Sequence, residues 1–161
     1  MQITRAVEYG AMGLICLARR APGETVMLEE ISLEEDVPSS FLGKIFQQLS
    51  RAGLIRSVRG NGGGYTLTKQ AEEITLLEIF EAIEGKLALQ RCLQQPSSCE
   101  RHDGCALCSV FEQAQDQVKD VFARTTVADL VKRHVSAGQT DRRHPLVGAK
   151  VGAKKLSNIR K

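Results

Sequence analysis

The chain has 161 residues, of which 42% are hydrophobic and 25% charged, the proportions of a globular protein of about one domain. This composition excludes a disordered chain, a collagen-like chain and a coiled-coil rod. No stretch approaches the about 20 apolar residues of a membrane span, and the N-terminus lacks a signal-peptide pattern, so we expect a cytosolic protein. The formal net charge of +3 arises at the end of the chain, where seven of the 22 basic residues follow residue 140. The overall charge therefore says little about the partner of the folded body.

A basic patch in the middle of the chain is more informative. No acidic residue occurs between Asp36 and Glu72. With acids at about 12% of the chain, such a gap arises at a given place by chance roughly once in a hundred. The basic residues inside it are Lys44, Arg51, Arg56, Arg59 and Lys69. A patch of one charge sign favours an anionic partner over an ordinary solvated face.

The first half of the chain predicts three helices. Apolar residues recur at steps of three and four over 3–20, and a short helix over 27–36 has Leu28, Ile31 and Leu33 as its apolar members. A third helix opens at Pro38 with a serine cap, runs to about residue 52 and ends at Gly53. We expect its inner face to hold Phe41, Leu42, Ile45, Phe46 and Leu49, and its outer face to hold Ser39, Ser40, Gly43, Lys44, Gln47 and Arg51. Two helices joined by a tight turn, the second polar and basic outside, indicate a helix-turn-helix.

A β-hairpin is predicted directly after this helix pair. Two β-prone runs, 54–58 and 65–68, flank a glycine cluster with Arg59 at its base. A hairpin in this place is a wing, and the glycines let its tip backbone approach a partner closely. The tip residues expected to contact DNA backbone or the minor groove are Arg59, Gly60, Gly62 and Gly63. A phosphate loop is disfavoured, because a strand-like run and not a helix follows the glycines.

The second half begins with a short helix over 75–84, for which Thr75 and Glu78 form a capping box. Residues 86–108 have no sustained period. From 109 to about 134 a long helix is expected, because apolar residues step by 3 and 4 in a heptad-like stripe. Since four helices already serve the core, we favour a dimerisation role for this helix. Residues 136–161 are rich in Gly, Lys and Arg and are expected to be disordered.

The chain has five cysteines, one in the first helix and four clustered in the second half. Cys16 lies alone on the apolar first helix and is expected to be a small core residue. The other four follow the pattern C-x6-C-x5-C-x2-C and are Cys92, Cys99, Cys105 and Cys108. In a cytosolic chain such a cluster suggests metal before disulfide. Structural zinc usually takes two C-x2-C pairs, so the wide spacings favour an iron–sulfur cluster, with zinc open as an alternative. A dithiol oxidoreductase using Cys105 and Cys108 is a weaker alternative, since no βαβ pattern surrounds them.

The motifs together resemble the Rrf2 family of transcriptional regulators, in particular its iron–sulfur cluster regulators and nitric-oxide-sensing repressors. The resemblance covers about residues 1–135. Residues 54–67 resemble the family's wing, and Ser39-Ser40-Phe41-Leu42 resembles the start of its recognition helix. The family implies a homodimeric winged-helix protein with a long crossing dimer helix and a cluster near the dimer interface.

The resemblance also implies the cluster ligands. Cys92, Cys99 and Cys105 match the family's three cysteine ligands, while the fourth ligand is either Cys108 or Glu8 of the first helix. The cofactor is then [2Fe–2S] or [4Fe–4S], with [2Fe–2S] favoured.

These observations predict a mostly α fold with a small β-hairpin: a winged helix-turn-helix domain and a long C-terminal dimerisation helix. The expected divisions are a DNA-binding domain (1–85), a cluster loop (86–108), a dimer helix (109–135) and a tail (136–161). The predicted function is a non-catalytic, homodimeric regulator that binds a near-palindromic promoter site in double-stranded DNA, with no membrane partner. We expect Gln47 to reach base edges and Lys44 and Arg51 to hold phosphates. The alternatives are a repressor whose cysteines bind zinc or no metal, the dithiol oxidoreductase, and an adaptor whose winged helix binds protein.

Overall fold

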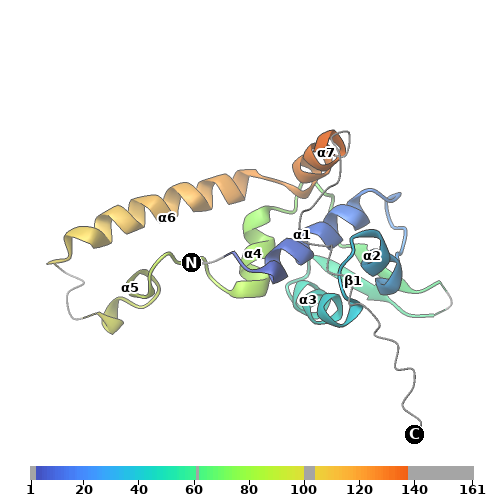
Figure 1. Cartoon of the computed structure of the whole chain (residues 1–161), viewed down its shortest axis with the longest axis horizontal. Helices are drawn as coiled ribbons and strands as arrows, with labels where there is room; N and C mark the ends of the chain where they lie inside the picture. The colour runs from blue at the N-terminus through green and yellow to red at the C-terminus, as the bar shows by residue number, and fades with distance from the viewer. Residues whose placement is uncertain (1–2, 61, 100–103, 138–161) are drawn as a thin grey trace, which may run out of the picture.

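The computed structural model describes residues 3–60, 62–99 and 104–137 and is mostly helical with one small sheet (Figure 1). Within these residues the helices are α1 (Arg5–Ala18), α2 (Leu28–Glu34), α3 (Ser39–Arg51), α4 (Leu76–Glu84), α5 (Arg91–Gln94), α6 (Ala106–Arg124) and α7 (Val127–Ala137), with a 3₁₀ turn η1 (Pro96–Ser98). Strands β1 (Ile55–Val58) and β2 (Gly64–Leu67) pair antiparallel. The predicted fold class is confirmed. The expected tail from residue 138 onward lies outside the described residues.

Helix α1 lies at the centre of the core, and α3, α4 and α7 pack against it. Leu14 of α1 and Phe46 of α3 are fully buried, and so is Cys16, which confirms its predicted place in the core. The backbones of α1 and α3 come close because residue 13 is glycine: a Cβ there would lie 2.6 Å from Cε2 of Phe46. The missing side chain therefore sets the distance between the central helix and α3.

Helices α2 and α3 form the predicted helix-turn-helix, with two local differences. The expected serine cap is wrong: Pro38 occupies the N-cap without a side-chain hydrogen bond, and Ser39 is already helical. Phe41 is also not on the inner face, because 61% of its surface is exposed. The buried stripe of α3 consists of Leu42, Ile45, Phe46 and Leu49. Gly53 follows the helix with a left-handed φ of 73°, as expected for a helix stop.

The long helix expected over 109–134 is two helices. α6 ends at Arg124 and α7 begins at Val127. The chain between them is hydrogen-bonded to the start of α4 and the residues before it. Leu76 N–H donates to the Thr125 carbonyl (2.8 Å), and Val127 N–H donates to the Ile74 carbonyl (2.9 Å). Val127 is fully buried in the main core. α7 thus packs with the winged-helix body, while Figure 1 shows α6 projecting away from it.

The segment before α6 is short and irregular, as the lack of periodicity predicts. It contains the single turn of α5 and the 3₁₀ turn η1. Its attachment to α6 includes a hydrogen bond from Leu89 N–H to the Gln115 side-chain oxygen (3.1 Å), and Gln115 is buried. Within the described residues, no helix is long and apolar enough to cross a membrane.

Candidate nucleic-acid interface and cysteine loop

The outer face of α3 is polar and carries cations without ionic partners. Of the six residues predicted to face outward, Gly43 is half-buried, and the five expected to contact DNA are exposed: Ser39, Ser40, Lys44, Gln47 and Arg51. Neither Lys44 nor Arg51 forms an ion pair with another described residue. Unpaired cations beside exposed hydroxyl and amide groups form a surface that is able to bind phosphate oxygens and base edges.

The inner face of α3 fixes this surface to the rest of the fold. Gln48 donates a hydrogen bond from Nε2 to the Ile83 carbonyl at the end of α4 (3.2 Å). The Phe46 ring meets Tyr65 of β2 edge to face, with ring centroids 4.9 Å apart. Helix α3 and the hairpin are therefore joined by an edge-to-face pair, which is a favourable geometry for two aromatic rings.

The predicted hairpin is present, and its strands pair over four residues each. Its four residue pairs run from Ile55 opposite Leu67 to Val58 opposite Gly64. Gly60 and Gly62 adopt left-handed φ values of 117° and 79°, which favour glycine. Arg59, Gly60 and Gly62 are exposed and Gly63 is half-buried, while Asn61 lies outside the described residues. Arg59 forms no ion pair within the part of the chain that the structure describes.

The four cysteines of the predicted cluster loop lie around the junction of α5 and α6. Cys92 is on α5, Cys99 follows η1, Cys105 is the N-cap of α6 and Cys108 is in its first turn. α5 packs against both η1 and α6. All four thiols are free and partly exposed. The sequence between Cys99 and Cys105, including His102, falls mostly outside the described residues.

Three of these thiols are electrostatic neighbours. Burial, the adjacent thiols of Cys92 and Cys105, and a hydrogen bond with Cys92 together raise the pKa of Cys108. No three of the four sulfurs lie mutually within 4.8 Å among the described residues. Partly exposed thiols at the meeting point of two helices fit a thiophilic metal centre as a donor set. Glu8, the alternative fourth ligand, is exposed on α1 and joins no such group.

A charged network surrounds Cys16 and is not among the features predicted from the sequence. The Cys16 thiol donates to the Glu34 carboxylate (3.5 Å), and Arg20 bridges Glu34 (2.7 Å) and Glu30 (3.0 Å). Arg19 also pairs with Glu34. Burial, followed by the negative charge of Glu34, raises the pKa of Cys16 to about 12. The network joins the end of α1 to α2 and keeps the thiol protonated. The adjacent basic residues Arg19 and Arg20, followed by the acidic run within 27–36, are the sequence feature that could have predicted these ion pairs.

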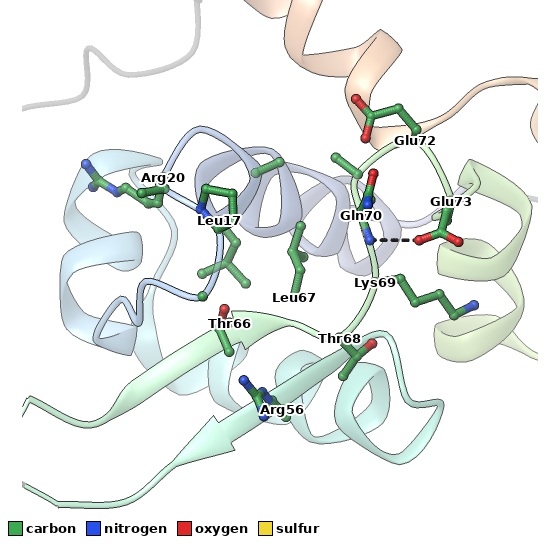
Figure 2. Close-up of a pocket in the computed structure, with 15 residues that line it drawn as sticks. Leu17, Arg20, Arg56, Thr66, Leu67, Thr68, Lys69, Gln70, Glu72 and Glu73 are labelled. Atoms are coloured by element: carbon green, nitrogen blue, oxygen red, sulfur yellow. Dashed lines mark hydrogen bonds between the residues drawn. The ribbon is translucent and has the colours of Figure 1, made fainter.

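A hollow of about 670 Å³ lies between the end of α1, strand β2 and the 68–73 segment (Figure 2). Leu17 and Leu67 form apolar parts of its wall, and Arg56 and Thr66 belong to the hairpin side. Gln70 N–H donates to Glu73 at its edge (3.1 Å). The residues that line it include no Cys, His or Ser.

The comparison with protein families agrees with this geometry. The Rrf2 profile, described as an iron-dependent transcriptional regulator, matches residues 3–133. The chain belongs to the Rrf2 family. This confirms the resemblance on which the sequence interpretation relied, and it identifies the chain as a DNA-binding transcriptional regulator of the Rrf2 type.

Curated and solved Rrf2 relatives agree with this assignment. The chain is 30% identical over 142 residues to the HTH-type transcriptional regulator IscR of Pectobacterium atrosepticum, which covers 88% of this chain and 86% of the relative. The oxidised form of Staphylococcus aureus CymR is similar in structure, with a TM-score of 0.64, 31% identity, and coverage of 82% of this chain and 97% of that one. CymR of B. subtilis, titled the global cysteine regulator, has a TM-score of 0.67 and 26% identity, with coverage of 83% and 98%.

Proposed function

We propose that this Rrf2 regulator binds promoter DNA as a two-fold homodimer and that an iron–sulfur cluster held by its cysteine loop sets its DNA affinity. The observation that carries the proposal is the gathering of Cys92, Cys105 and Cys108 where α5 meets the first turn of α6. The description of the matching family as iron-dependent supports the same chemistry.

In the proposed complex, α3 enters the major groove and the wing follows the adjacent backbone or minor groove. Gln47 reaches base edges, whereas Lys44 and Arg51 hold phosphates. Arg59 approaches DNA together with the tip glycines Gly60, Gly62 and Gly63. Ser39 and Ser40 lie at the start of α3, where hydroxyl and backbone N–H groups face the same phosphates. Removing one phosphate contact, as in Lys44→Ala, lowers the slope of log affinity against log salt by about 1.

The proposed dimer forms through the uncovered side of α6. Leu107, Val110 and Val121 are 61%, 58% and 61% exposed. At 100° per residue they fall on one side of the helix together with Ala114. A second copy is the favoured occupant, because two-fold pairing also gives two DNA-reading heads for a near-palindromic site with half-sites about 34 Å apart.

The proposed ligands are Cys92, Cys99, Cys105 and Cys108, with Glu8 from the second subunit as the alternative to Cys108. A [2Fe–2S] cluster is favoured over [4Fe–4S]. Cysteine thiolates are the usual ligands of both, and a bound cluster supplies a centre whose stability depends on iron supply, oxidants and nitric oxide. The four side chains hold it, and α5, η1 and the first turn of α6 orient them.

Ligation would order the loop between the winged domain and α6. Metal-dependent ordering of a short thiol-rich segment contributes directly to folding free energy. The start of α6 would become fixed relative to α4 and α1, and with it the angle between the two heads. A coupling of about 1–3 kcal/mol, typical of such switches, changes DNA affinity about 5- to 150-fold.

Anaerobic purification with iron, sulfide and visible-absorbance analysis tests the cluster, and fluorescence anisotropy with promoter DNA tests the switch. We expect a coloured wild type whose DNA affinity changes when the cluster is removed. Cys99→Ala should lose both the colour and the change, whereas Cys16→Ala, which keeps all four loop thiols, should retain them. A colourless zinc protein with unchanged DNA binding would overturn the sensor and favour a winged-helix repressor. Reduction of insulin disulfides that depends on Cys105 and Cys108 would favour the oxidoreductase.

A further inference from the structure

The segment between α1 and α2 lies along the wing as a third, single-residue strand. Val26 N–H donates to the Tyr65 carbonyl (3.0 Å), and Tyr65 N–H donates to the Val26 carbonyl (2.8 Å). The preceding residue reaches further along the hairpin, since the Thr25 hydroxyl donates to the Gly62 carbonyl at the tip (2.8 Å). The contact joins residues 37 positions apart in the chain.

The wing tip has no other hydrogen bond to the rest of the fold within the described residues. Gly63 N–H donates to the Gly60 carbonyl (2.9 Å), but this bond is internal to the tip. A Cβ built on Gly60 or Gly62 would meet nothing within 4 Å, so packing does not hold these positions.

The backbone at Val26 lies against the start of β2, close enough to fix the position of the wing there. A Cβ on Gly64 would lie 2.3 Å from the Val26 carbonyl oxygen, so glycine at this position is what permits the approach. The bridge at Val26 and Tyr65 fixes the base of the turn, and the Thr25 hydroxyl fixes the turn itself. One short segment therefore determines the direction in which Arg59 and the tip glycines point.

We propose that Thr25 is a positioning residue for DNA binding: its hydroxyl holds the wing tip in the pose that meets DNA. This inference rests on the proposed contact between wing and DNA. Thr25 acts through the Gly62 carbonyl and the Arg59 side chain and does not itself contact DNA. Without the hydroxyl, the tip populates other poses, and the apparent dissociation constant rises in inverse proportion to the fraction of molecules that remain in the competent pose.

The test compares Thr25→Val, which keeps the β-branched shape but removes the donor, with Thr25→Ser, which keeps the donor. The matched control is Thr68→Val, because the Thr68 hydroxyl makes the same kind of bond to the Gly53 carbonyl at the hairpin base. For a neutral hydrogen bond we expect T25V to weaken promoter binding roughly two- to tenfold. T25S should bind within about twofold of wild type and T68V likewise, while T25V and T68V should have similar melting temperatures.

A double-mutant cycle with Arg59→Ala decides how Thr25 acts. If the hydroxyl works through the wing tip, T25V adds little to the loss already caused by R59A. Fully additive losses would show that Thr25 acts elsewhere and would overturn the inference, as would unchanged binding by T25V or an equal loss in T68V. Failure of the wild type to bind DNA would overturn the proposed function itself, which is a separate outcome.

Discussion

Charging the uncovered side of α6 should dissociate the proposed dimer. Val121 is 61% exposed in the single chain, and we expect the partner's α6 to cover it. Complete burial of a Val or Leu side chain is worth about 1.5–3 kcal/mol, so covering the exposed three-fifths is worth about 1–2 kcal/mol. Two-fold symmetry counts the change twice, which gives about 2–4 kcal/mol for Val121→Glu before any cost of desolvating the carboxylate. The dimer dissociation constant should therefore rise roughly 30- to 700-fold.

Sedimentation velocity over a range of protein concentrations measures this change, with the cluster content of each sample held constant. Ala123→Glu is the matched control, because residue 123 is exposed on the opposite side of α6 and receives the same charge. We expect A123E to dimerise like wild type and V121E to dissociate and to bind a palindromic site more weakly. Equal dissociation constants for V121E and A123E would refute the assignment of this surface as the dimer interface.

Three further predictions concern stability and reactivity. Gly13→Ala should lower the free energy of unfolding by about 1–3 kcal/mol, because the new Cβ overlaps the Phe46 ring, and Phe46→Leu in the same chain should recover part of the loss in urea unfolding. Cys16 should resist alkylation at pH 8 in the native protein, since its pKa is about 12, and should react only on unfolding, as followed by mass spectrometry; modification at the rate of the loop thiols would contradict the network. Hydrogen bonds from the backbone and hydroxyl of Thr126 lower the pKa of Asp129, so its contribution to stability is complete above its unfolded pKa of about 3.9 and is lost as pH falls through the folded value. The difference in urea stability between wild type and Asp129→Asn should therefore shrink between pH 6 and pH 3, and a constant difference would refute this.

The winged-helix half follows closely from its sequence because local signals and tertiary contacts agree there. The capping box of Thr75 and Glu78 is formed as predicted, with hydrogen bonds in both directions. Gly53 and Gly85 end their helices at positive φ. Phe41 was placed wrongly because periodicity alone does not say how wide the covered stripe is. Leu42, with the residues three, four and seven positions later, already fills the inner face, which leaves Phe41 at its rim.

The break between α6 and α7 was not predictable from hydrophobic spacing. The heptad-like stripe continues through Thr125 without proline or glycine, so the sequence pattern favours one helix. Backbone hydrogen bonds of Thr125 and Val127 with Leu76 and Ile74 replace the helical ones at this point, so long-range pairing overrides local helix propensity. A signal was nevertheless present: Thr126 and Asp129 form the same capping arrangement as Thr75 and Glu78.

The conformation of the cysteine loop could not be predicted, because the spacing of its cysteines indicates the chemistry of the side chains and not the path of the backbone. The sequence indicates which side chains are suited to a thiophilic centre, but η1, the turn of α5 and the contact of Leu89 with Gln115 have no periodic signature. These contacts depend on α6 being in place, so they are tertiary in origin. The proposed ligand set accordingly rests on the positions of the thiols around α6 and on the family, and the loading experiment is what tests it.

The two sides of α6 suggest how a change in the cysteine loop would reach DNA. Its covered side packs Val118 and Phe122 against a cluster that includes Phe80 of α4, with the two aromatic rings 6.0 Å apart. α4 in turn accepts the hydrogen bond from Gln48 of α3 at the Ile83 carbonyl. The uncovered side faces the proposed second subunit. A shift at the first turn of α6 would therefore act on both contacts at once, whereas α7, fixed in the core through Val127, would stay with the winged domain. Backbone hydrogen bonds of Thr125 and Val127 with Leu76 and Ile74 hold the junction of α6 and α7 to the core, so we expect the change to arise at the start of α6 and to pass to α3 through the contacts of α6 with α4.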